Sequence, residues 1–284
     1  MSVAVASIDV LAEAQSTTIT LTKPASTASG DLLLVHIQTR NDGSGTPTGN
    51  SISSVPSGWT LGKFQKGTGG NVYQTAQYYY KVAGGSEPST YDFGQEGNFY
   101  FRASIWRITG ARTVSPIGTD NSDFVNNTST PSLATTITPN ANSLIVQLWG
   151  GIDGANSSGS YAIATDNPSW TEGYSAALTA GGAVTGRFVS AYAVRSQSTA
   201  TGNMSLSGGG ASSDWAGILL AIPPLISASV SDTSTVTDSV SLLKTTSLTV
   251  SDTSTVTDSQ SEVKSKKWTN DSKNTSSWVN DTKH

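Results

Sequence analysis

Histidine, the side chain that most often transfers protons near neutral pH, is almost absent from this chain. The 284 residues contain two histidines, His36 within the apolar run DLLLVHI and His284 at the last position. A Ser-His-Asp triad would have to use His36, but a histidine inside an apolar strand is better explained as a hydrogen-bonded core residue. Cysteine is absent, which excludes disulfides, thiolate catalysis and cysteine-ligated metals, and two histidines are too few for a zinc site.

Paired carboxylates are the remaining route to catalysis, because two of them can hydrolyse a glycosidic bond. The first 224 residues hold the glutamates Glu13, Glu87, Glu96 and Glu172. Glu87 and Glu96 bracket the YDF segment, with Asp92 between them, and nothing in their context marks a raised pKa. We interpret these carboxylates as solvated turn residues and expect a protein that is not an enzyme.

Two short segments carry oxygen ligands that would suit calcium. Asp120, Asn121 and Asp123 lie in GTDNSDF, and Asp153 and Asn156 lie in GIDGANSS. Hard oxygen ligands on loops are the ligands that Ca²⁺ prefers, but neither segment matches an EF-hand or a glycine-rich calcium repeat. We expect no cofactor, with calcium at these loops as the alternative.

Aromatic side chains give the strongest indication of a binding surface. Trp59 and Trp170 each follow a Pro-Ser turn, and Tyr79 lies in the tyrosine-rich segment QYYYKV. Exposed aromatic faces stack on sugars or anchor interfaces, so Trp59, Trp170 and Tyr79 are candidate glycan contacts. The recurrence of the tryptophans in both halves of the sequence also suits core positions, and this alternative stays open.

The overall composition is that of an all-β protein with many turns. Charged residues make up 13% of the chain, against about 25% in a typical soluble domain, and glycine is frequent. The net charge is −4 and no basic patch occurs in the first 224 residues, so we expect no nucleic-acid partner. No apolar run approaches the roughly 18 residues of a membrane span, and the N-terminus is a poor signal peptide. We therefore expect a protein that enters no membrane and either stays in the cytosol or leaves the cell with an assembly.

The elements that must position these residues are predicted to be strands. Segments of alternating or continuous apolar residues are separated by turns rich in glycine, serine and asparagine, and no long helical period occurs. The clearest strands are 31–37 (DLLLVHI), 74–82, 99–108, 144–149 (LIVQLW), 187–194 and 215–222. The simplest architecture is an antiparallel, jelly-roll-like β-sandwich spanning residues 1–224, ending at Pro223-Pro224 where strand pairing must stop. The alternative is that each half forms a small sandwich of its own.

The two halves of this body resemble each other, at about 17–111 and 130–224. Val35 precedes Trp59 by 24 positions, and Val146 precedes Trp170 by 24 positions. We interpret the pattern as an internal duplication, which predicts that Val35 is equivalent to Val146 and Trp59 to Trp170. The matching segments, in order, are 29–38 with 141–149, 56–60 with 168–171, 76–82 with 190–195, and 102–111 with 214–223.

Residues 225–263 form a different kind of segment, rich in serine, threonine and aspartate. VSDTSTVTDS occurs at 230–239 and again, letter for letter, at 250–259. As a strand, each copy would place its valines and aspartates on one face and hydroxyl groups on the other. Such a segment has too little apolar surface to fold alone, so it is either disordered or ordered against a partner chain. Its aspartates could bind calcium between chains or serve solubility alone, and the interface candidates are Val230, Val236, Val250 and Val256.

Residues 264–284 carry a second short repeat. KWTNDSKN at 267–274 returns as SWVNDTKH at 277–284, which aligns Trp268 with Trp278. The residues around the two tryptophans contain almost nothing apolar for them to pack with, and an exposed tryptophan is unfavourable unless it docks. Trp268 and Trp278 are therefore candidate anchors, with a flexible tail as the alternative.

The series GDLLLVHI, PSGWT, QYYYKVA, SEPSTYDF and RASIWRITGA resembles β-sandwich proteins of tailed-phage structural modules and related bacterial surface proteins. The ending WTNDSKNTSSWVNDTK is similar to the short Trp-Asn repeats that close many phage virion proteins. The resemblance implies a virion component such as a fibre, tail, neck or decoration protein, assembled in the host cytoplasm from copies of itself and other virion proteins. A carbohydrate-binding adhesin or receptor-binding module is the alternative.

Overall fold

A computed structural model describes residues 2–41, 51–69, 72–128, 130–152, 161–165, 168–178, 186–206 and 213–225. The chain divides into two units, Met1–Ser229 and Val230–His284, and every described residue belongs to the first. The described residues form strands without a helix, which confirms the prediction of an all-β, antiparallel protein. The predictions for the repeats, including Val230, Val236, Val250, Val256, Trp268 and Trp278, fall outside the described residues.

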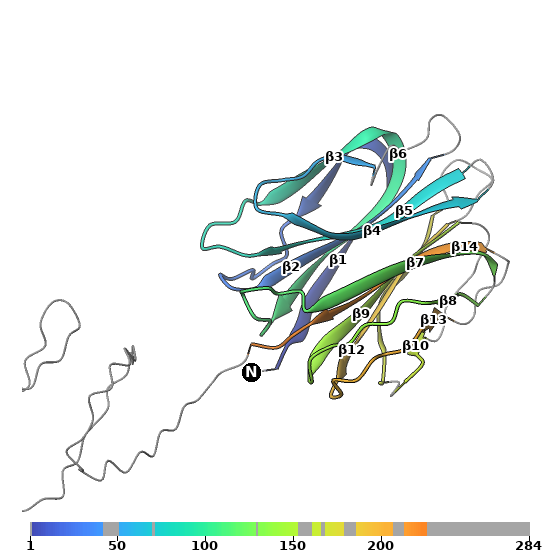
Figure 1. Cartoon of the computed structure of the whole chain (residues 1–284). Coiled ribbons are helices and arrows are strands. Elements are labelled where there is room, and N and C mark those ends of the chain that lie inside the picture. Colours follow the sequence, from blue (N-terminus) through green and yellow to red (C-terminus); the bar gives the residue numbers. More distant parts are fainter. Residues whose placement is uncertain are drawn as a thin grey trace, which may run out of the picture. The chain divides into compact units, whose positions relative to one another are not determined.

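The first half of the unit forms a six-stranded antiparallel sheet (Figure 1). The apolar run at 31–37 becomes a central strand that is covered on both faces, as its lack of alternation predicts. In spatial order the sheet contains β1 (Ala4–Thr22), β6 (Thr90–Thr109), β2 (Leu32–Asn41), β5 (Val72–Val82) and β4 (Thr60–Gly69), while β3 (Ile52–Ser54) pairs with β6.

The second half forms a five-stranded sheet and a separate three-stranded sheet, both antiparallel. The larger sheet has the order β11 (Thr171–Leu178), β12 (Gly186–Arg195), β9 (Ser143–Ile152), β14 (Ser213–Ile222) and β7 (Thr119–Thr128). The smaller has the order β10 (Tyr161–Ile163), β13 (Met204–Leu206) and β8 (Ser132–Leu133).

The two larger sheets share one apolar core in a sandwich-like arrangement. Residues such as Leu34 and Trp106 of the first sheet and Val146 and Ile218 of the second belong to one buried cluster. Each sheet also buries much of its outer face. The second half of β1 and the first half of β6, together with β3, cover the first sheet, and Figure 1 shows the long bend of β6. The three-stranded sheet covers the second.

The two halves have the same strand order. Reading from the matching edge, β1-β6-β2-β5-β4 corresponds to β7-β14-β9-β12-β11. The outer layers correspond as well. In the first half of the molecule, β3 pairs with the first half of β6, and that part of β6 pairs with the far end of β1. In the second half, β10 pairs with β13 and β13 pairs with β8 in the same order. Gly30 and Asn142 precede β2 and β9 and both have positive φ, of 89° and 60°.

These two turns fix the register between the halves and correct one predicted pair. Counting from Gly30 and Asn142, Leu34 matches Val146, and both lie in the shared core. Val35 lies on the outer face of its sheet, so the predicted equivalence of Val35 and Val146 is wrong by one residue. A one-residue slip moves every side chain to the opposite face of a strand, and matching residue types alone could not exclude it.

Trp59 and Trp170 occupy matching positions. Each tryptophan immediately precedes the last strand of its sheet, β4 or β11, and packs on the cluster at the outer face. The sequence then continues as Trp-Thr-x-Gly in both halves, and each strand has a bulge at that glycine, Gly62 or Gly173. The repeated tetrapeptide thus specifies the same structural device twice.

Candidate functional site

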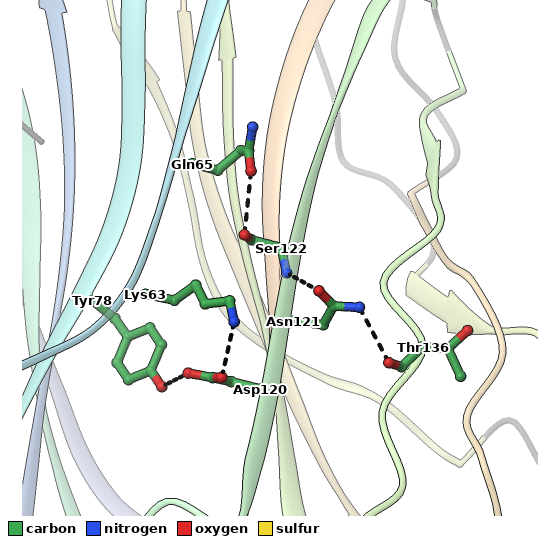
Figure 2. A network of polar contacts seen from close by, with 7 residues as sticks. All are labelled: Lys63, Gln65, Tyr78, Asp120, Asn121, Ser122 and Thr136. Carbon is green, nitrogen blue, oxygen red and sulfur yellow. Dashed lines mark hydrogen bonds and ion pairs between the residues drawn. The ribbon is translucent and has the colours of Figure 1, made fainter. Parts of the chain in front are cut away.

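The edge strands β4 and β7 come from different sheets and meet along a polar seam (Figure 2). Asp120 of β7 accepts hydrogen bonds from the hydroxyl of Tyr78 and from Nζ of Lys63, the latter at 3.3 Å. Burial, reinforced by the Asp120 carboxylate, raises the pKa of Tyr78, so its phenol remains a protonated donor. The Lys63 side chain is 35% exposed, and a partly exposed ion pair of this kind adds little stability of its own.

The seam continues along both strands at every second residue. The hydroxyl of Ser122 donates to Oε1 of Gln65 at 3.2 Å. Two residues further along each strand, the ring of Phe124 packs over Gly67, where an added Cβ would lie only 1.8 Å from that ring. Three successive inward positions of β4 therefore contact three of β7, and side chains rather than backbone hydrogen bonds join the two edges.

Side chains on the opposite face of β7 form hydrogen bonds with the segment that follows β8. Asn121 donates to the carbonyl of Thr136 at 3.3 Å, as Figure 2 shows. The Asp123 carboxylate accepts the backbone N–H groups of Phe124 and Ala134, at 2.8 and 3.0 Å. Asp120 and Asp123 thus point to opposite faces of a strand, and the structure does not bring them together as calcium ligands.

Asp153 and Asn156, the other calcium candidates, lie outside the described residues. Within the described part of the chain, no three histidine, aspartate or glutamate side chains gather as metal ligands would.

The matching seam at the other side of the molecule is apolar. When the two halves are aligned, Lys63 of β4 corresponds to Tyr174 of β11, and Asp120 of β7 corresponds to Ile8 of β1. Ile8 and Tyr174 pack with Trp106 on the shared core, and the ring centroids of Trp106 and Tyr174 are 6.0 Å apart. The same strand arrangement thus forms the polar seam between β4 and β7 on one side and an apolar contact between β11 and β1 on the other.

His36 lies between the two sheets, where its ring is fully buried. Its Nδ1 is hydrogen-bonded to the hydroxyl of Tyr174, and its ring stacks on Phe188 with centroids 4.4 Å apart. Desolvation lowers the pKa of His36 to about 3, so the imidazole is neutral at physiological pH. The arrangement agrees with the interpretation of His36 as a hydrogen-bonded core residue.

Glu87 differs from its prediction as a solvated turn residue. Its carboxylate accepts hydrogen bonds from Nζ of Lys81, the N–H of Gly84 and the hydroxyl of Tyr91, at 2.8, 2.7 and 2.8 Å. Burial alone would raise the pKa of Glu87, but these bonds outweigh it and hold the pKa below its ordinary value. Glu87 therefore ties a turn to β5 and β6 as a stable carboxylate, while Glu96 lies exposed on β6.

Two of the three glycan candidates are core residues. Tyr79 is 0% exposed and Trp59 is 8% exposed, and both belong to the outer cluster of the first sheet. Trp59 makes edge-to-face contacts with Tyr91 and Phe93, with centroids 5.0 and 5.6 Å apart. Neither ring presents a face for stacking on a sugar. Trp170 is half-buried at the margin of the outer cluster of the second sheet.

Sequence reasoning missed the seam because its partners are far apart in the chain. Lys63 and Asp120 are separated by 57 positions, and neither lies in a recognisable motif. The repeated Trp-Thr-x-Gly could have identified β4 and β11 as matching edge strands, because the glycine bulge re-aims the residues that follow it.

Comparison of the chain with protein-family models, with curated proteins and with solved structures finds no match. No helix among the described residues is long and apolar enough to cross a membrane.

Proposed function

We propose that the chain is a non-enzymatic structural protein of a tailed-phage virion, a fibre, tail, neck or decoration component. In this proposal the first unit is a displayed, jelly-roll-like β-sandwich, and the residues after it attach the chain to neighbouring subunits. The observation that carries the proposal is the letter-for-letter recurrence of 230–239 at 250–259, followed by the paired tryptophan segments of 264–284. Equal short units suit equal docking sites on repeated partners.

The contrast between the two parts of the chain supports this division of roles. The described unit buries three apolar clusters, one between its larger sheets and one on each outer face. The repeats offer mainly hydroxyl and carboxylate side chains with few valines, which is too little apolar surface to fold without a partner.

The titratable residues of the described unit also support a structural role. His36 is buried and neutral between the sheets, Glu87 is held by three donors, and Asp120 joins two strands. Each of these side chains is committed to holding the fold, which favours display over catalysis.

Attachment through the tryptophan repeat is testable in particles. The double change Trp268→Ala with Trp278→Ala should lower the amount of the protein in purified virions at least about tenfold, because truncating a central aromatic anchor costs about 2 kcal/mol or more. The matched control is Ser272→Ala with Ser276→Ala in the same segment, which should leave incorporation unchanged. Normal incorporation of the tryptophan variant would contradict attachment, and specific binding of the full chain on a glycan array would favour the adhesin instead.

A further inference from the structure

The outer face of β4 carries two large apolar side chains in an unusual position. Leu61 is 37% exposed and Phe64 is 41% exposed, and both point away from the shared core. The layer that covers the rest of this face, formed by β3, the second half of β1 and the first half of β6, packs on a cluster that does not include Leu61 or Phe64. β4 is also the last strand of its sheet, so among the described strands it pairs with β5 alone.

The second half of the molecule shows that the fold does not require these side chains. β11 is the counterpart of β4, and the matching bulges place Leu61 opposite Glu172 and Phe64 opposite Ser175 in the alignment. The same backbone plan is therefore built with polar residues at both positions. Exposed leucine and phenylalanine on β4 indicate a contact that β11 does not make.

A charge lies on the same face. Lys66 follows Phe64 by two residues, so the outer face of β4 presents Leu61, Phe64 and Lys66 in a row. In the VSDTSTVTDS repeat, a strand would present valines and aspartates on one face, and the repeat holds two aspartates and no basic residue. The valines of the repeat can pack on Leu61 and Phe64, and an aspartate can form an ion pair with Lys66. The repeat and β4 also have the same length, ten residues.

We propose that the outer face of β4, formed by Leu61, Phe64 and Lys66, is the docking surface for a VSDTSTVTDS repeat of a neighbouring copy of this chain. The proposal rests on the structural role argued above and names the partner surface for it. Each chain carries two identical repeats, whereas the described unit has this combination of residues on β4 and not on its counterpart β11. Repeats therefore outnumber sites by two to one. A repeat that occupies the site of a neighbouring copy links the two chains, and the neighbour's own repeats can link further copies, which gives an assembly that can extend.

The test replaces the apolar pair with the residues that β11 carries. In the full chain, Leu61→Glu with Phe64→Ser should raise the protein concentration needed for half-maximal self-association at least about tenfold, measured by light scattering after size exclusion. The matched control is Val114→Ser, since Val114 is 79% exposed in the segment between the halves. The control should associate like the wild type, and all three proteins should melt at similar temperatures.

A second measurement identifies the contact. Carbodiimide cross-linking of an equal mixture of ¹⁴N- and ¹⁵N-labelled chains should join Lys66 to repeat aspartates in mixed-isotope peptides. Peptides of one isotope alone would mean that each chain docks on itself, which overturns the proposal. A wild-type chain that stays monomeric would overturn it too. Unchanged association of the Leu61→Glu, Phe64→Ser variant also overturns the docking surface, and it leaves the virion assignment intact because that assignment is read from particle composition.

Discussion

His36 shows how a side chain with catalytic potential becomes part of a core. Its ring is buried between the sheets, bonded to Tyr174 and stacked on Phe188. The counterpart of His36 in the second half is Leu148, which also faces the shared core. A position that an aliphatic residue fills in one half is filled in the other by a histidine that cannot readily accept a proton.

This burial predicts how stability depends on pH. The pKa of His36 is about 3 in the folded protein, against 6.5 for a histidine exposed to water, so below pH 6.5 the unfolded chain binds a proton that the folded chain does not. The free energy of unfolding should therefore fall as pH falls from 6.5 towards 3, by up to about 1.4 kcal/mol per pH unit from this residue.

The check compares melting temperatures between pH 7 and pH 4. His36→Leu, which places the counterpart's residue at this position, should lose melting temperature less steeply with acid than the wild type. His284→Gln, a change at the other histidine, should follow the wild type. If the His36→Leu and wild-type curves run parallel, the buried histidine does not contribute to acid sensitivity.

At the scale of elements, the paired bulges of β4 and β11 are the clearest device that the two halves share. A Cβ on Gly62 would lie 2.0 Å from the ring of Tyr78, and one on Gly173 would lie 2.5 Å from Oγ of Ser190. Glycine is needed at both bulges because an inward side chain of the neighbouring strand passes directly over them. The bulge in β4 also sets Lys63 towards Asp120, and so positions the polar seam.

Gly62→Ala tests this close approach. The added methyl group must displace Tyr78, which is buried and bonded to Asp120, so the variant should lose about 1–3 kcal/mol in the free energy of unfolding. Gly85→Ala is the matched control, because a Cβ there has nothing within 4 Å. Chemical denaturation measures both. Equal stability of the two variants would show that Tyr78 yields without loss, and that the bulge does not require glycine.

The strands were largely predictable because the central ones are continuous runs of apolar residues in the sequence. The run at 31–37 and the run at 144–149 became the central strands β2 and β9, each buried on both faces. Register was not predictable, since Val35 and Val146 are alike in type but face opposite sides of their sheets. The seam was hidden for another reason: Lys63 and Asp120 approach only after two sheets have packed, and no local pattern encodes that distance.

At the scale of the whole molecule, the chain combines one unit with three buried clusters and a repetitive segment of contrasting composition. In the described unit, the titratable side chains His36, Glu87 and Asp120 all help to hold the fold. The repeats carry duplicated sequence and two tryptophans with almost no apolar residues around them in the sequence. The proposed function, a displayed body with an attaching extension, accounts for both parts, and in the further proposal the outer face of β4 in one copy binds a repeat of another copy.

In the proposed function, this protein is a structural component of a virion. Quantitative mass spectrometry of gradient-purified phage particles, with the major capsid protein as the internal standard, tests it most directly. The proposed function predicts that the full-length chain is present in a fixed ratio to the capsid protein, and that this ratio persists through repeated purification and a high-salt wash. Absence of the chain from particles, or its steady loss with each purification step, would contradict the assignment.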